Sequence, residues 1–273
     1  MKRRKVIGLF LLALGFLIVG CNPEAGADER KEQEVIVFAA ASLAEAFTEI
    51  ANQFEIEHPG STVVLNFAGS QQLTHQLSQG APADVFASAN KQQMDAAIET
   101  GRVMEGSQQP FVRNQLVVVY PASNPGKLQN LTDLAQPGLR LIVAAPEVPA
   151  GQYAQSFLSA AGQNDSFGPT FRNGVLDNIV SYEENVRAVL SKIALGEADG
   201  GIVYISDLNG QAARQVGSLA IPGELTMVAD YPIAPVNNSD ENDFALSFIE
   251  FVLSNQGQEI LQSFGFLPVR SSQ

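Results

Sequence analysis

The chain has 273 residues, of which 45% are apolar and 16% are charged. This composition supports packed cores of about two ordinary domains and excludes a disordered or coiled-coil protein. A single cysteine and two histidines exclude a disulfide framework and a cysteine-based zinc cluster. The net charge of -13 argues against nucleic acid as a partner, because a phosphate-binding surface must be locally basic.

The N-terminus has the pattern of an export signal. Four basic residues, Lys2 to Lys5, precede the uncharged run Val6 to Gly20. That run is short for a membrane span of about twenty residues but typical of a secretory signal, so we predict a signal peptide over 1–20. The segment Ile18-Val19-Gly20-Cys21 resembles a bacterial lipobox, which implies a lipid on Cys21 and an extracytoplasmic protein anchored to the membrane. A buried free cysteine is the alternative.

A flexible tether is predicted over 21–34, where proline, glycine and charged residues occur without periodic apolar positions. Removal of the signal peptide takes away four basic residues and no acidic one. The exported chain then carries 12 basic and 29 acidic residues, a net charge of -17.

From Val35 onward, apolar runs of strand length alternate with apolar residues at helical spacing. Val35 to Ala40 reads as a strand, and a helix follows with apolar residues from Leu43 to Phe54 at intervals of three and four. Later strands are predicted over 62–67, 84–87, 115–120, 139–144, 178–182 and 201–205, and helices around 73–77, 94–98, 152–161, 184–195, 240–253 and 256–264. This alternation predicts an α/β protein with parallel sheets covered on both faces.

The domain organisation follows from length. About 240 structured residues without a detectable repeat favour two lobes over one oversized sheet. We predict that residues 35–117 and 230–273 form lobe 1, and that residues 118–229 form lobe 2, which is inserted into it.

The starts of the helices suggest a binding site. Ser42 and Glu45 have the spacing of a capping box, and Ser70 follows small residues at the start of the next helix. In α/β sheets, ligands lie beyond the carboxyl ends of the strands, where helix N-termini present free N–H groups. The pattern predicts an anion site made of uncharged donors, and a plain helix cap is the alternative for each serine.

Several segments, in order along the chain, resemble the motifs of the molybdate-binding proteins that feed ABC importers. These segments are Val37 to Leu43, Gly80 to Ala89, Val148 to Gly151, Glu184 to Arg187, Gly201 to Tyr204, Tyr231 to Ile233 and Gly265-Phe266. The resemblance implies a two-lobed periplasmic-binding-protein fold of type II with the oxyanion in the interlobe cleft. It further implies a monomeric receptor that is not an enzyme, has no cofactor, binds molybdate or tungstate, and delivers it to importer membrane and ATPase subunits.

The same resemblance implies the ligands of the oxyanion. Ser42 and Ser70 would bind it through hydroxyl and backbone N–H groups, Ala150 and Val186 through backbone N–H groups, and Tyr204 through its phenol. The only metal would be the molybdenum of the bound oxyanion. Two departures occur: Ala68-Gly69-Ser70-Gln71 stands where the family often has two or three serines, and the loop before Val148 is a residue shorter.

Other functions and roles remain open from the residues alone. A receptor for sulfate or phosphate on the same fold is one alternative, and a serine hydrolase is another, although Ser70 lacks the G-x-S-x-G pattern. Tyr204 could equally be a core aromatic residue. Neutral donors without an acceptor favour a fully ionised oxyanion over protonated phosphate.

Several charged residues could take part in a site, but each has a plainer interpretation. Asp84 is expected to hold loop or hinge backbone groups, and Arg187 to lie on a solvated helix face. The pair Glu183-Glu184 could hold a metal ion. His58 and His75 are expected at the surface, because turn or polar residues flank them.

Overall fold

The computed structural model describes residues 33–210, 212–237 and 242–269. The predicted signal peptide, Cys21 and the tether up to residue 32 lie outside these residues. The first strand begins at Gln33, so the last two residues of the predicted tether belong to the fold. Within the described ranges, no helix is both long and apolar enough to cross a bilayer.

Most elements follow the predicted alternation of strands and helices, but β8, β9 and α5 were not predicted, and within the described residues no α-helix separates β7, β8 and β9. The strands are β1 (Gln33–Ala40), β2 (Ser61–Ala68), β3 (Val85–Ala87), β4 (Gln109–Pro121), β5 (Leu141–Ala144), β6 (Ile179–Glu183), β7 (Gly200–Tyr204), β8 (Val216–Ala220) and β9 (Val228–Pro235). The α-helices are α1 (Ala44–Glu57), α2 (Ser70–Ser78), α3 (Lys91–Glu99), α4 (Pro149–Ala161), α5 (Phe171–Asp177), α6 (Val186–Ala194), α7 (Asn242–Leu253) and α8 (Asn255–Ser263). Short 3-10 turns are η1 (Ala41–Leu43), η2 (Leu131–Ala135), η3 (Ile205–Asn209), η4 (Ala212–Gln215) and η5 (Gly223–Leu225).

The sheet is mixed rather than parallel throughout. Its strand order is β2-β1-β3-β9-β4-β7-β5-β6, with β8 paired to β4. The pairs β1–β2, β1–β3, β5–β6 and β5–β7 are parallel, whereas β4 is antiparallel to β7, β8 and β9, and β3 to β9. The prediction of parallel sheets is therefore wrong for β4, β8 and β9. The chain passes into the second group of elements along β4 and returns along β9, so these two strands run in opposite directions. β7 and β8 run in the same direction as β9 and are therefore also antiparallel to β4.

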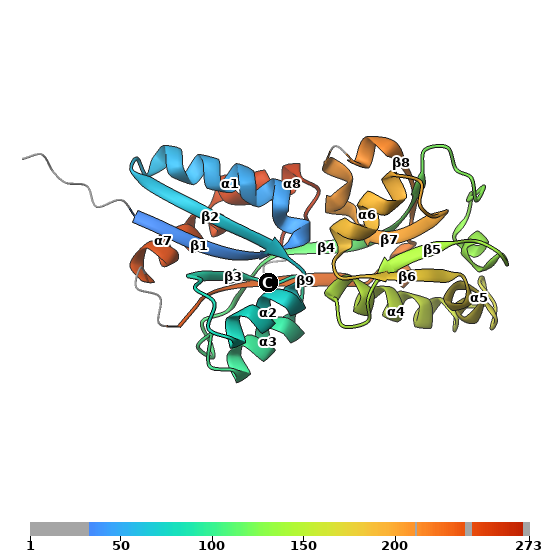
Figure 1. Ribbon diagram of the computed structural model, residues 1–273, viewed down its shortest axis with the longest axis horizontal. Helices are drawn as coiled ribbons and strands as arrows, with labels where there is room; N and C mark the ends of the chain where they lie inside the picture. The colour runs from blue at the N-terminus through green and yellow to red at the C-terminus, as the bar shows by residue number, and fades with distance from the viewer. Residues whose placement is uncertain (1–32, 211, 238–241, 270–273) are drawn as a thin grey trace, which may run out of the picture. The chain divides into compact units, whose positions relative to one another are not determined.

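Two strands are shared by two groups of elements. The first part of β4, residues 109–115, pairs with β9, while its second part, residues 116–121, pairs with β7 and β8. We call β1–β3 with α1–α3, α7 and α8 the first half, and β5–β8 with α4–α6 the second half; β4 and β9 run between them (Figure 1). The predicted borders at 117/118 and 229/230 fall inside β4 and β9, and the division into lobes at these residues stays a prediction.

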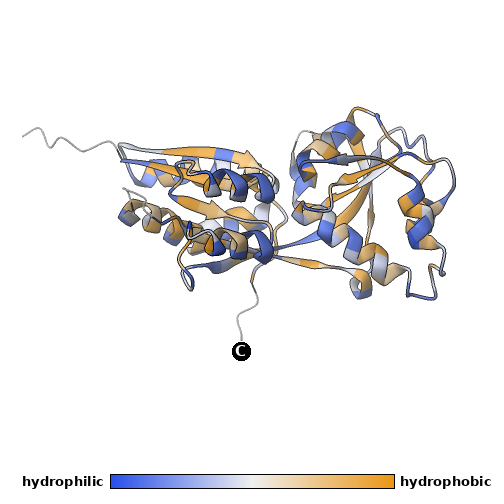
Figure 2. Ribbon diagram, turned by 60° about the horizontal axis from the view of Figure 1, so that its bottom comes forward, coloured by the Kyte–Doolittle hydropathy of each residue, from blue (hydrophilic) through white to orange (hydrophobic). Residues whose placement is uncertain are grey.

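Apolar strands enclosed by helices hold each half together (Figure 2). Phe47 and Phe54 of α1 are fully buried, and the rings of Phe54 and Phe248 of α7 lie 5.3 Å apart. On the other face, Leu73 of α2 and Phe86 of β3 are also fully buried. Each such side chain contributes about 1.5–3 kcal/mol on burial. The packed layers thus hold the carboxyl ends of β1 and β2 in place, where the pocket lies.

Candidate functional site

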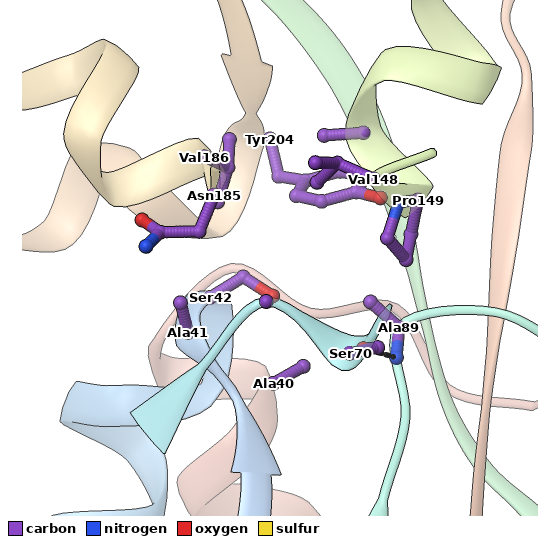
Figure 3. Close-up of a pocket in the computed structure, with 12 residues that line it drawn as sticks. Ala40, Ala41, Ser42, Ser70, Ala89, Val148, Pro149, Asn185, Val186 and Tyr204 are labelled. Atoms are coloured by element: carbon purple, nitrogen blue, oxygen red, sulfur yellow. Dashed lines mark hydrogen bonds between the residues drawn. The ribbon is translucent and has the colours of Figure 1, made fainter. Parts of the chain in front are cut away.

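A pocket forms where strands end and helices begin, and it collects all five residues predicted from the sequence. Its lining is uncharged and consists of Ala40, Ala41, Ser42, Gly69, Ser70, Ala89, Val148, Pro149, Ala150, Asn185, Val186 and Tyr204. Residues of the first half face residues of the second half across it (Figure 3). Segments far apart in the sequence therefore supply one small site.

Ser42 does not cap a helix. It lies inside η1, and α1 begins at Ala44 without a side-chain cap. The Ser42 hydroxyl lies 2.8 Å from the hydroxyl of Tyr231, and Glu45 forms an ion pair with Arg187. The predicted capping box is wrong, because the 3-10 turn puts Ser42 within the helical run and both side chains have distant partners.

Ser70 opens α2, as predicted, but does not cap it. The N-cap is Gly69, whose N–H donates to Gln72 Oε1 at 3.0 Å. The Ser70 Oγ accepts a hydrogen bond from the Ala89 N–H, also at 3.0 Å. The prediction that Ser70 caps the helix is wrong, because the side chain of Gln72 binds the N-cap amide.

The second half contributes two helix starts. In α4, Val148 is the N-cap and Pro149 takes the first helical position, which suits a residue without an N–H. In α6, Asn185 is the N-cap and accepts from the Ala188 N–H at 3.0 Å. The first N–H groups of a helix have no partner within it. The amides at Ala150 and Val186 can therefore serve an anion in the pocket.

Tyr204 ends β7 and is 1% exposed. Its hydroxyl is buried and has no hydrogen-bond partner in the described part of the chain. Burial first, and then the neighbouring phenol of Tyr231, raise the pKa of Tyr204 well above the usual value, so the phenol keeps its proton. An unpaired buried hydroxyl costs about 1–3 kcal/mol, which a ligand acceptor would offset.

Side chains also join the two halves around the pocket. The connections are Gln71 Nε2 to Glu184 O at 2.7 Å, Gln72 Nε2 to Glu184 Oε2 at 3.0 Å, Asn90 Nδ2 to Gln152 Oε1 at 2.8 Å, and the Arg187–Glu45 ion pair. Arg187 was expected on a solvated helix face, but it pairs with the carboxylate of Glu45. None of these side chains belongs to the lining, which carries no charge.

The remaining charged candidates have other partners. Asp84 accepts from the Ile36 N–H at 2.7 Å. It therefore binds backbone, as expected, but the backbone of strand β1 and not that of a loop or hinge. Glu183 pairs with Lys192 at 2.7 Å. No group of three His, Cys, Asp or Glu side chains that could hold a metal ion occurs among the described residues. His75 is exposed, whereas His58 is half-buried and stacks on Phe54, so the prediction of a surface position is only partly correct for His58.

Asp207 is a buried carboxyl group behind the pocket that the sequence pattern did not single out. It is fully buried, and its Oδ2 accepts from the Tyr204 N–H at 2.9 Å. Its Oδ1 has no partner within the described residues. Burial raises the pKa of Asp207 to about 7 despite the Tyr204 N–H and the nearby Arg187. Asp207 therefore titrates near neutral pH, unlike the five predicted ligands of the pocket.

We expect Asp207 to make the stability of the protein depend on pH. Between about pH 4 and pH 7 the folded chain keeps a proton that the unfolded chain has lost, so the free energy of unfolding should fall by up to about 1.4 kcal/mol per pH unit as pH rises. Melting curves across this range should show that slope in the wild type and a flatter one in Asp207→Asn. The exposed Asp165→Asn is the control, and an unchanged slope in Asp207→Asn would contradict the assignment.

The fold and the pocket define a class of protein: a two-lobed α/β receptor with the periplasmic-binding-protein fold of type II. The periplasmic molybdate-binding protein of Azotobacter vinelandii has the same fold, with a TM-score of 0.73, 23% identity and coverage of 86% of this chain and 100% of that one. Residues 35–267 match the model of a family described as bacterial extracellular solute-binding protein, and the chain belongs to this family.

Two other proteins have higher sequence identity to this chain than the Azotobacter vinelandii protein. The chain is 37% identical over 259 residues to the molybdate-binding protein ModA of Mycobacterium tuberculosis, covering 94% of each sequence. It is 30% identical to YvgL of Bacillus subtilis, provisionally described as an ABC transporter substrate-binding lipoprotein, covering 96% of this chain and 98% of that protein. The predicted resemblance to the molybdate-binding proteins is confirmed.

Proposed function

We propose that this protein binds molybdate, and also tungstate, outside the cytoplasmic membrane and delivers it to an ABC importer. The observation that carries the proposal is the uncharged pocket in which Ser42, Ser70 and Tyr204 meet the starts of α4 and α6. The Tyr204 hydroxyl is buried there and has no hydrogen-bond partner among the described residues. The relatives named as molybdate-binding proteins support the choice of ligand.

The proposed ligands are the five predicted residues. Ser42 and Ser70 each offer a hydroxyl and a backbone N–H, Ala150 and Val186 each offer a backbone N–H, and Tyr204 offers its phenol. The acidic exported chain repels a dianion at long range, so affinity must come from these local donors. Each hydrogen bond to a charged group is worth about 1.5–3 kcal/mol.

Calorimetric titration with molybdate, tungstate, sulfate and phosphate tests the proposal. Molybdate and tungstate have nearly the same size and charge and should bind with similar affinity. Sulfate has shorter bonds, which would leave donors stretched beyond good hydrogen-bond distance. Phosphate carries a proton that needs an acceptor. Sulfate binding as tight as molybdate binding would contradict the proposed ligand.

The pocket gives the serine hydrolase alternative no support. Ser42 and Ser70 contact Tyr231 and the Ala89 N–H instead of a histidine in the described structure. A nucleophilic serine needs a base within hydrogen-bond reach. A receptor that binds without covalent chemistry is the function that these contacts favour.

The membrane anchor is a separate part of the proposal. The lipobox-like segment around Cys21 and the lipoprotein description of YvgL support a lipid on Cys21. In cells, Cys21→Ser should move the protein from the membrane fraction to the soluble fraction and leave molybdate binding unchanged. Retention of the variant on membranes after signal cleavage would argue against the lipid.

A further inference from the structure

A buried chain of hydrogen bonds leads away from Ser42 into the core. The Tyr231 hydroxyl lies 2.8 Å from Ser42 Oγ and 3.3 Å from Asn114 Nδ2. The same nitrogen of Asn114 donates to Ser206 Oγ at 2.8 Å. All four side chains are at most 4% exposed. These hydrogen bonds join β4, β9, η1 and η3 behind the pocket. Of the five proposed ligands, the series includes Ser42 alone.

The direction of these hydrogen bonds follows from the chemistry of the groups. Asn114 Oδ1 accepts from the Gln115 N–H at 3.0 Å, which turns the Nδ2 group toward Tyr231 and Ser206. An amide nitrogen only donates, so the Tyr231 oxygen accepts from Asn114. Burial raises the pKa of Tyr231 well above the usual value, so its proton stays in place.

Ser42 Oγ is the acceptor that the described structure places within hydrogen-bond distance of the Tyr231 hydroxyl. The Tyr204 hydroxyl has no hydrogen-bond partner in the described structure, which leaves Ser42 Oγ as the acceptor. Because Ser42 Oγ accepts this bond, its own proton is free to point into the pocket. The hydrogen bond at Ser70 has the same direction, because Ser70 Oγ accepts from the Ala89 N–H (Figure 3). The Ser70 proton is therefore also free to point into the pocket.

We propose that Tyr231 and Asn114 are positioning residues that hold the Ser42 hydroxyl as a hydrogen-bond donor to the ligand and so favour oxyanions without a proton. The inference rests on the proposed function for the place of the ligand. Hydrogen phosphate has the same charge as sulfate and molybdate, but its O–H needs an acceptor. At Ser42 the oxygen accepts from Tyr231 and the hydroxyl proton is directed to the ligand, so this position offers the ligand a donor. A phosphate O–H that faces this donor would be left unpaired, which is costly.

The experiment replaces Tyr231 by phenylalanine, which removes the hydroxyl and keeps the ring contacts with Phe111 and Phe266. Ser42 then becomes free to donate or to accept. Titrations with molybdate, sulfate and hydrogen phosphate should show molybdate affinity about tenfold lower, and a ratio of phosphate to sulfate dissociation constants reduced by about three- to tenfold. An unchanged ratio would overturn the inference. The ratio compares two ligands on one variant, so partial loss of stability does not affect it.

A double-mutant cycle separates a role through Ser42 from a general structural role. If Tyr231 acts through Ser42, Tyr231→Phe should have no further effect on molybdate affinity in a Ser42→Ala background. Equal losses in both backgrounds would overturn the inference. The exposed Tyr182→Phe serves as a control that should leave affinities and the ratio unchanged.

The same titrations distinguish failure of the inference from failure of the proposed function. A wild type that binds sulfate but not molybdate overturns the proposed function, while the phosphate-to-sulfate ratio still tests Tyr231. A wild type that binds molybdate, with the ratio unchanged in Tyr231→Phe, overturns only the inference. A wild type that binds none of these oxyanions overturns both.

Discussion

Replacing Gly69 by alanine is expected to lower molybdate affinity by at least about 100-fold while both halves of the protein stay folded. A Cβ atom at Gly69 would lie 2.6 Å from the carbonyl oxygen of Glu184, which belongs to the opposite side of the pocket. The amide of Gln71 would also be close, but a flexible side chain can move away. The backbone carbonyl can move only if the two halves separate.

The backbone conformation of Gly69 suits alanine, with φ -59° and ψ 139°. The steric conflict therefore arises across the pocket rather than within α2. Separation of the halves would take the N–H groups of Ala150 and Val186 away from an anion bound at Ser42 and Ser70. Two charge-assisted hydrogen bonds of about 1.5–3 kcal/mol each correspond to at least about 100-fold in affinity.

Calorimetry and solution scattering of Gly69→Ala with and without molybdate measure this effect. Gly223→Ala is the matched control, because nothing lies within 4 Å of a Cβ atom built there. We expect the control to bind and to compact like the wild type, since ligand binding should draw the halves together. Wild-type affinity in Gly69→Ala would show that close approach of the halves is not needed.

Tyr204→Phe is expected to lower molybdate affinity by about ten- to a hundredfold without lowering the melting temperature of the ligand-free protein. The lost hydroxyl is buried and has no hydrogen-bond partner in the described part of the chain, so its removal breaks no contact there. Removing an unpaired buried polar group is neutral or stabilising, whereas losing a hydrogen bond to a charged ligand costs about 1.5–3 kcal/mol.

Melting curves and titrations on the same preparation decide between the two interpretations of Tyr204. The expected pattern is an unchanged or higher melting temperature together with weaker binding. A lower melting temperature with full molybdate affinity would mean that Tyr204 is only a core aromatic residue. Tyr182→Phe, on the exposed side of β6, should change neither quantity.

Much of the fold was predictable because its signals are local. The apolar run of β1 and the apolar positions of α1 occupy the places that their spacing indicates, and α4 and α6 begin near the predicted residues. Strand β9 was harder to predict, because Pro232 and Pro235 interrupt its pattern. Its register depends on pairing with β3 and β4, which are more than a hundred residues away.

Five of the residues that line the pocket were predictable from the sequence. Ser42, Ser70, Ala150 and Val186 stand at or near predicted helix starts, and the resemblance to the molybdate-binding proteins added Tyr204 and the role of all five as ligands. The partner of each hydroxyl depends on the tertiary structure. Ser42 meets Tyr231 across 189 residues of chain, and burial sets the pKa of Asp207. Hydrogen-bond direction and desolvation depend on packing between segments that are distant in the sequence. The local spacing of residues cannot predict that packing.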